Sequence, residues 1–232
     1  MSLQISNLSA GYDGTPILRD INCTVADGEI VGVVGRNGVG KTTLLKSVMG
    51  LLTPDGGRVE FNSTDLTDEP ADVRARGGIG YVPQGRDVFP GLTVEQNLLI
   101  GENVGTGEET LYDRVYEYFP ILEERADQDA GTMSGGQQQM LAIGRAIIGG
   151  PDLLLVDEPS EGVQPSIVQS ITKDLRRINE ELGTTILFVE QNLSVIQGLA
   201  DRCYAMDHGT IVDELDGNEL ANRAQLEEYL VV

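Results

Sequence analysis

The stretch from Gly28 to Leu52 reads GEIVGVVGRNGVGKTTLLKSVMGLL. Its apolar, β-branched beginning at Ile30 to Val34 predicts a buried strand, and the glycines that follow predict a turn. After Lys41 the apolar residues recur at helical spacing along one side of the segment, which predicts a helix. The stretch is therefore expected to fold as a strand, a loop and a helix.

The loop inside this stretch, GRNGVGKT at 35–42, fits the pattern G-x-x-x-x-G-K-[ST] of a phosphate-binding loop. Glycines let backbone N–H groups close around phosphate oxygens, and the helix N-terminus adds positive potential. Lys41 can reach the β and γ oxygens, and the Thr42 hydroxyl can coordinate Mg²⁺. A plain glycine-rich turn would leave Lys41 unexplained. The predicted nucleotide contacts are Gly35, Arg36, Asn37, Gly38, Val39, Gly40, Lys41, Thr42 and Thr43.

Further strands and helices follow in alternation. Buried-type strands are expected at 78–83, 152–157 and 184–190, and a helix with one apolar stripe is expected at 165–182. This order predicts an α/β fold with a mainly parallel sheet. Residues 3–12 and 17–29 alternate with a period of two, which indicates an antiparallel β layer, and residues 203–214 are expected to form a hairpin.

Between Gln84 and Gly149 the pattern is helical, with helical segments at 93–101, 108–127 and 134–150 and no convincing strand. We therefore expect one domain, 1–232, in which a helical subdomain at 85–148 is inserted into a core formed by 1–84 and 149–232. Three aromatic residues in it recur at helical spacing and are expected to pack in the core: Tyr112, Tyr116 and Phe119.

Two acids end the strand in LLLVDEP, at Asp157 and Glu158. The carboxyl ends of strands are where α/β sheets present groups to a ligand. Asp157 can hold Mg²⁺ through water, and Glu158 can polarise an attacking water molecule. A pair of acids at a strand end is often only solvated, but beside a phosphate loop the pair is expected to be catalytic.

The segment MSGGQQQ, from Met133 to Gln139, opens a predicted helix. The Ser134 hydroxyl and the amides of Gly135 and Gly136 can form a second phosphate cradle. Together with YVPQ, which ends at Gln84, these motifs resemble the ATP-binding cassette (ABC) ATPases in order and over nearly the whole chain.

The resemblance implies a P-loop NTPase core of the RecA-like kind that uses ATP and Mg²⁺. It also implies a head-to-tail dimer, with each ATP between the phosphate loop of one subunit and Ser134, Gly135, Gly136 and Gln137 of the other. Gln84 is then expected to contact Mg²⁺ and the reacting water. Tyr12 matches the aromatic residue that stacks on adenine, although a tyrosine before Asp-Gly is about as often an ordinary turn residue.

Two longer segments narrow the resemblance. YVPQGRDVFPGLTVEQNL at 81–98 and DEPSEGVQPSIV at 157–168 look like the ATPases of hydrophobic amino-acid and urea importers, and VQPSIV looks closest to the urea branch. The expected partners are two membrane permeases, a solute-binding protein on the far side, and either a second copy or a paralogous ATPase. The expected location is the cytoplasmic face of the membrane.

Three residues depart from the family pattern: Met133, Gln164 and Gln191 stand where leucine, aspartate and histidine are usual. Gln191 can orient water and bond a phosphate oxygen, but it cannot become cationic. Hydrolysis is expected to survive, with transition-state charge on Lys41, Mg²⁺ and the SGGQ helix. A module that has lost hydrolysis and a soluble ABC ATPase outside transport stay open as alternatives. The only histidine, His208, is expected at the surface of the 203–214 hairpin.

The net charge is −21, from 37 acidic and 16 basic residues, which argues against nucleic acid as a partner. Such an excess is tolerable where salt screens it, so a salt-rich cytoplasm is expected. No segment reaches the length of a membrane span, and the N-terminus lacks the pattern of a signal peptide. Cys23 and Cys203 show no metal-ligand spacing and are expected to be buried and inert.

Overall fold

The computed structural model describes residues 2–102 and 111–230. Its larger sheet has six strands in the order β10-β9-β3-β8-β7-β6, and all neighbouring strands except the β9–β10 hairpin run parallel. The mainly parallel sheet and the C-terminal hairpin are therefore confirmed. The strands are β3 (Ile30–Val34), β6 (Ile79–Val82), β7 (Leu153–Asp157), β8 (Thr185–Glu190), β9 (Arg202–Asp207) and β10 (Thr210–Leu215).

A second sheet is antiparallel throughout, with strand order β2-β1-β4-β5. The pair expected from the period-two pattern, β1 (Leu3–Tyr12) and β2 (Thr15–Val25), is present. β4 (Gly56–Phe61) and β5 (Thr64–Asp65) extend it and were not predicted. The antiparallel β layer expected at the N-terminus is confirmed.

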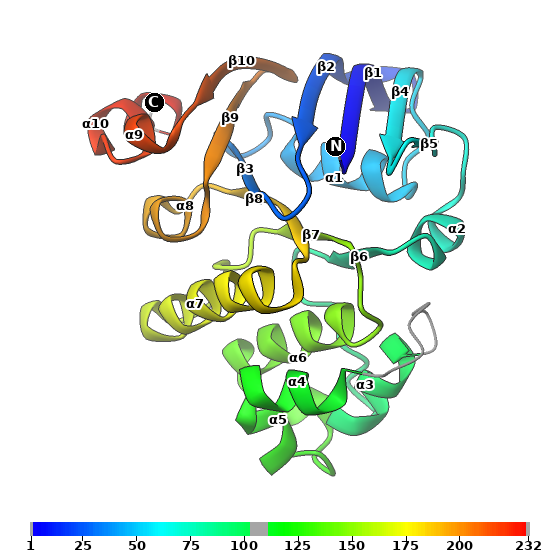
Figure 1. The fold of residues 1–232 in the computed structure, drawn as a ribbon, viewed down its shortest axis with the longest axis vertical. Coiled ribbons are helices and arrows are strands. Elements are labelled where there is room, and N and C mark those ends of the chain that lie inside the picture. The colour runs from blue at the N-terminus through cyan, green and yellow to red at the C-terminus, as the bar shows by residue number, and fades with distance from the viewer. Residues whose placement is uncertain (1, 103–110, 231–232) are drawn as a thin grey trace.

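The helix after the phosphate loop, α1 (Lys41–Met49), packs between the two sheets (Figure 1). Leu44, Leu45 and Val48 are fully buried and share one core with apolar residues of β1, β2, β3, β7 and β8. This packing fixes the direction of α1, so the helix N-terminus and the loop before it have one defined position.

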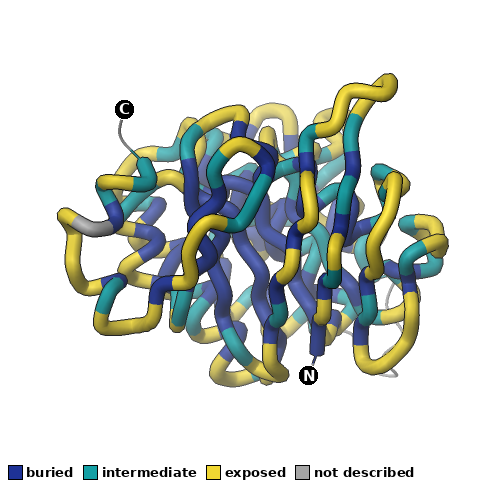
Figure 2. Tube along the Cα trace, turned by 90° about the horizontal axis from the view of Figure 1, so that it is seen from above, coloured by how far each residue is buried: buried dark blue, intermediate teal, exposed yellow. Residues whose placement is uncertain are grey.

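The other face of the six-stranded sheet is covered by α6 (Gly135–Ile147), α7 (Pro165–Leu182) and α8 (Leu193–Leu199), which form the second core. Figure 2 shows that the buried segments lie inside and that the exposed ones follow the turns around them. The remaining helices are α2 (Ala71–Arg76), α3 (Val94–Glu102), α4 (Tyr112–Tyr118), α5 (Pro120–Glu124), the 3₁₀ turn η1 (Ala130–Thr132), α9 (Gly217–Leu220) and α10 (Arg223–Leu230).

The helical segment expected at 108–127 is two helices. Pro120 provides no backbone N–H and disfavours a helical conformation in the residue before it. Phe119 accordingly has φ −128° and ψ 72°, so α4 ends there and α5 begins at the proline. Phe119 is buried, and the Tyr112 and Tyr116 ring centroids lie 6.2 Å apart. Residues 108–110 of the expected segment lie outside the described residues.

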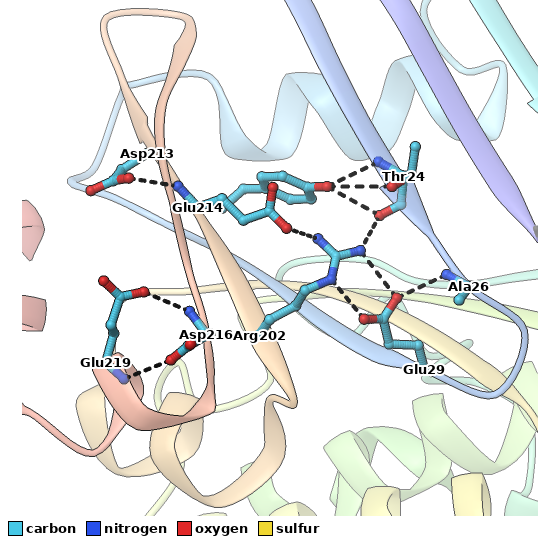
Figure 3. A network of polar contacts seen from close by, with 9 residues as sticks. Thr24, Ala26, Glu29, Arg202, Asp213, Glu214, Asp216 and Glu219 are labelled. Carbon is cyan, nitrogen blue, oxygen red and sulfur yellow. Dashed lines mark hydrogen bonds and ion pairs between the residues drawn. The ribbon is translucent and has the colours of Figure 1, made fainter.

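A polar network joins the C-terminal hairpin to the turn between β2 and β3 (Figure 3). The Arg202 guanidinium donates to Glu29 at 2.6 Å, to the Thr24 carbonyl at 2.6 Å and to Glu214 at 3.0 Å. The central carbon of the guanidinium, Cζ, also lies 4.8 Å from the centroid of the Tyr204 ring. One partly buried side chain thus ties the six-stranded sheet to the antiparallel sheet.

Both cysteines are buried free thiols, as expected, and burial raises the pKa of each to about 12. His208 lies in the β9–β10 turn with its side chain 90% exposed, also as expected. In the part of the chain that the structure describes, no helix combines the length and the apolar character needed to cross a bilayer.

Candidate functional site

The parallel register gathers the chemically important segments at one edge of the six-stranded sheet. Val34 at the end of β3 lies opposite Glu190 at the end of β8, and Asp157 at the end of β7 lies opposite Val189. The phosphate loop, the acids at the end of β7 and the loop containing Gln191 therefore all follow the carboxyl ends of adjacent parallel strands. This is the place where α/β sheets bind ligands.

The phosphate loop needs glycine for two separate reasons. A Cβ at Gly35 would lie 2.3 Å from the carbonyl oxygen of Met206, so no side chain fits there. Gly40, the residue before α1, has φ 114°, which L-residues rarely adopt. Val39 is buried in the core, so its contribution to an anion site would come from its backbone. Close packing at Gly35 and the backbone conformation at Gly40 therefore both require glycine in this loop.

Lys41 is the first residue of α1 and is only 3% exposed. Its ammonium donates to the carbonyl oxygens of Gly35 at 2.9 Å and Arg36 at 3.0 Å, and it lies 3.3 Å from Oε1 of Glu158. These contacts hold the charge over the loop, beside the carboxylate predicted to be the catalytic base.

Thr42 and Asp157 bring together two side-chain oxygens of the kind that bind Mg²⁺. The Thr42 hydroxyl donates to Oδ1 of Asp157 at 3.1 Å, and the Tyr81 hydroxyl lies 3.4 Å from Oδ2. Asp157 is fully buried, and burial raises its pKa to about 6, with the neighbouring Glu158 charge adding to the effect. Desolvation and a nearby like charge both disfavour the ionised form of this carboxyl.

Glu158 adopts a left-handed backbone conformation with φ 45°. Non-glycine residues in this region are uncommon, and such strain concentrates at functional sites. Its side chain is 8% exposed and lies between Lys41 and the Gln84 amide, whose Nε2 is 3.5 Å from Oε2 of Glu158. Gln84, from the segment after β6, is therefore brought to the acids of β7.

Lys41, Thr42, Gln84 and Glu158 line an open pocket of about 340 Å³, whereas Asp157 is buried behind it and is not among the lining residues. Tyr12 is 43% exposed and lines the pocket, so its predicted stacking role stays a prediction. The pocket is lined by Tyr12, Ile17, Asn37, Gly38, Gly40, Lys41, Thr42, Thr43, Gln84, Glu158 and Glu161.

Ser134 begins α6 with a capping box. Its hydroxyl accepts from the Gln137 amide at 3.4 Å, and its own amide donates to the Gln137 side chain at 2.9 Å. Among the described residues, none of this SGGQ segment lines the pocket of its own chain. Ser134 is exposed at this helix N-terminus, whereas Gly136 is buried and the Arg86 guanidinium lies beside Gly135.

The chain matches the model of the "ABC transporter" family over residues 18–161. It belongs to the ABC transporter family. It is 42% identical to the high-affinity branched-chain amino acid transport ATP-binding protein BraG of Pseudomonas aeruginosa, over 90% of this chain and 91% of the relative. It is 36% identical to the probable branched-chain amino acid transport ATP-binding protein LivF of Archaeoglobus fulgidus, over 97% of both chains.

Solved ABC cassettes share the fold. A nucleotide-free cassette superposes with a TM-score of 0.85 at 28% identity, covering 100% of this chain and 99% of the other. A dimeric cassette in a post-hydrolysis state, bound to ADP and phosphate, gives 0.82 at 25% identity, covering 93% and 98%. The ABC chain described here is therefore an ATPase that binds ATP, of a family whose importers combine ATPase dimers with transmembrane permeases.

The structure places the remaining predicted residues of this ABC ATPase as follows. Gln191 is exposed just beyond β8, and its backbone amide donates to the Glu190 carboxylate at 2.7 Å. Gln191 is not among the residues that line the pocket, in the part of the chain described. Gln164 precedes α7 and makes no side-chain cap. A catalytic role for Gln191 thus stays a prediction.

Three residues near the site were missed by sequence reasoning: Tyr81, Arg86 and Glu190. Glu190 ends a buried strand as Asp157 does, and that shared pattern was a usable signal. Arg86, two residues after Gln84, donates to the carbonyls of Glu161 at 3.2 Å and Gly162 at 3.0 Å. No sequence signal connects Arg86 with those positions.

Proposed function

We propose that this ABC ATPase is the motor subunit of an importer for branched-chain amino acids. The observation that carries the proposal is the cluster in which Lys41 meets Glu158 beside the Thr42–Asp157 pair. The printed functions of the BraG and LivF relatives supply the solute class. Urea is the second candidate, because VQPSIV at 163–168 looks like the urea branch.

The proposed chemistry assigns one task to each side chain. Lys41 and the loop amides bind the β and γ phosphates, and Tyr12 stacks on adenine. Glu158 accepts a proton from the attacking water, which Gln191 orients. Ser134, Gly135, Gly136 and Gln137 of a second subunit close over the γ-phosphate from the other side.

Mg²⁺ would be held by Thr42, Asp157 and Gln84. The described residues contain no group of three His, Cys, Asp or Glu side chains arranged as a metal site. Of Thr42, Asp157 and Gln84, only Asp157 is a carboxylate, which fits Mg²⁺, because proteins usually bind it through one or two carboxylates together with water and phosphate oxygens. When bound, Mg²⁺ would neutralise charge on the β and γ phosphates.

We also propose that residues 85–148 form a helical subdomain inserted between 1–84 and 149–232, and that a permease loop docks beside it. An open groove there is lined by Leu51, Tyr81, Pro83, Asp87, Val88, Phe89 and Arg145. Leu51 and Phe89 are exposed, and Arg145 lies 5.0 Å from the centroid of the Phe89 ring. Exposed apolar side chains beside a partly buried cation fit a permease loop that carries an amphipathic segment at the cytoplasmic face.

The subunit arrangement follows from the same proposal. Two copies, or one copy and a paralogue, bind two permeases, and a solute-binding protein delivers the solute on the far side of the membrane. The acidic excess further suggests that the complex works in a salt-rich cytoplasm.

The test of the motor is Mg²⁺-dependent ATP hydrolysis by the chain with its permeases, in parent, Glu158→Gln and Lys41→Ala forms. Glu158→Gln should keep ATP binding and lose turnover by about a hundredfold or more, because the amide has the shape but not the basicity of the base. Lys41→Ala should weaken ATP binding at least about tenfold. Full turnover in Glu158→Gln, or unchanged ATP affinity in Lys41→Ala, would contradict these roles.

Uptake of labelled leucine and labelled urea in a deletion strain decides the solute. Loss of leucine uptake alone supports the amino-acid importer, and loss of urea uptake alone supports the second candidate. Retention of both would favour an ATPase that is not coupled to either importer.

A further inference from the structure

Glu190, the last residue of β8, is a carboxylate with none of its surface exposed. A buried carboxylate is tolerated only when hydrogen bonds satisfy it. Three backbone amides do so here: Oε1 accepts from Ser160 at 3.0 Å, and Oε2 accepts from Gln191 at 2.7 Å and Asn192 at 2.8 Å. Hydrogen bonds to an ionised acceptor are the strong kind.

The two carboxylate oxygens serve two different segments of the chain. Oε1 holds the turn that follows Glu158, and Oε2 holds the loop that carries Gln191. These segments leave neighbouring parallel strands, β7 and β8. One side chain therefore fixes the position of one segment relative to the other.

The turn held by Oε1 is the one that keeps Glu158 in its strained conformation. Left-handed backbone at a non-glycine residue persists only where surrounding contacts enforce it. The Glu158 amide donates to the Val189 carbonyl at 3.0 Å, the Glu161 amide donates to the Glu158 carbonyl at 3.1 Å, and the Ser160 amide between them donates to Glu190. The Glu190 bond is thus one of several that hold this turn, beside those from Arg86 to the carbonyls of Glu161 and Gly162.

We propose that Glu190 is a positioning residue that sets the relative placement of Glu158 and Gln191 around the attacking water. The inference rests on the proposed function, in which Glu158 is the base and Gln191 orients the water. Displacing a catalytic group by about 1 Å can cost about a hundredfold in rate. Glu190 touches neither nucleotide nor water in this scheme and acts only through the two segments.

The isosteric amide cannot replace this carboxylate. A glutamine at 190 has one acceptor oxygen, and its NH₂ group faces backbone N–H donors in either orientation. With the oxygen toward Gln191 the Ser160 bond is lost, and with the oxygen toward Ser160 the Gln191 and Asn192 bonds are lost. Glu190→Gln therefore separates the two segments while preserving the volume of the side chain.

The experiment compares ATP turnover, ADP affinity and melting temperature for parent, Glu190→Gln and Glu29→Gln. Glu29 is the matched control because its carboxylate also accepts from a backbone amide, that of Ala26 at 2.8 Å. It immediately precedes β3, whereas the phosphate loop follows the other end of that strand. For Glu190→Gln we expect kcat to fall at least about tenfold with the Kd for ADP within about threefold of the parent. For Glu29→Gln we expect a lower melting temperature and an unchanged kcat.

A smaller fall in kcat for Glu190→Gln overturns the inference, and so does an equal fall in Glu29→Gln, since general loss of stability would then explain it. If Glu190→Gln does not fold, Glu190→Asp gives the same comparison: it keeps the buried charge and withdraws it by one methylene from the three amides. Parental kcat in that variant also overturns the inference. A parent protein without ATP turnover would contradict the proposed function and this inference with it.

Discussion

Lys41 illustrates how one side chain links binding to chemistry. Its ammonium lies 3.3 Å from Glu158, and it is also the cation to which the phosphates are proposed to bind. Phosphate oxygens and the Glu158 carboxylate therefore compete for the same positive charge. If the phosphates bind as proposed, the 3.3 Å contact between Lys41 and Glu158 is expected to lengthen, because the ammonium then faces a second anion.

Gln191 is the residue whose role the structure leaves to experiment. Gln191→Ala is expected to lower kcat at least about tenfold while changing ATP affinity less than about threefold, because an orienting amide acts on the water rather than on the bound phosphates. Turnover at saturating ATP, measured with the permeases present, checks this. Parental turnover in that variant would mean that Gln191 takes no part in hydrolysis.

Cys23 and Cys203 are expected to be unreactive in the folded protein. Burial raises the pKa of each thiol to about 12 from 9.0, so both stay protonated in the folded state well above neutral pH. Since the unfolded thiols ionise from about 9 upward, the free energy of unfolding falls as the pH rises through that range. A chromogenic thiol reagent at pH 8 should react slowly with folded protein and fully in urea. Equal rates in both would contradict the burial.

At the scale of elements, Arg202 joins β9 to the turn before β3. Replacing it with methionine removes bonds to Glu29 and to the Thr24 carbonyl, and we expect a loss of about 2–4 kcal/mol in the free energy of unfolding. Arg58→Met is the control, because Arg58 is 52% exposed and its ion pairs on β4 and β5 should contribute under about 1 kcal/mol. Urea denaturation measures both. Similar losses would show that the network adds no more than surface pairs do.

The predictability of the elements depended on how local their signals are. β3, β7 and β8 were predicted because continuous apolar runs that end in glycine or acid are typical of buried parallel strands. β4 was missed because its start, Gly56-Gly57-Arg58, resembles a turn, and it is a strand only through pairing with β1.

The site was predictable to a similar extent and for the same reason. The phosphate loop and the acids after β7 carry local motifs, so their residues could be named from sequence. The strand end marked Glu190 as a candidate, but its partner Ser160, like the partner Asp157 of Tyr81, lies on another segment and is brought close only by the sheet register. Contacts of this kind depend on three-dimensional packing.

For the whole molecule, the dominant physical fact is a net charge of −21. We expect the melting temperature to rise as KCl increases from about 0.05 M to about 2 M, because the screening length shrinks to a few ångströms and repulsion among the acidic side chains weakens. A parallel series in sucrose separates screening from general exclusion of cosolvent. A flat or falling curve in KCl would argue against adaptation to salt without affecting the ATPase assignment.

The capping box of α6 bears on how fast two subunits can close on ATP. The Ser134 hydroxyl accepts from the Gln137 amide, so its own proton remains to be donated to an incoming phosphate. The same oxygen can then serve its helix and a ligand together, and α6 need not unwind or be rebuilt when the partner arrives. If a second subunit closes on ATP as proposed, we expect no slow refolding step in this helix, so that diffusion and permease geometry govern the rate of closure.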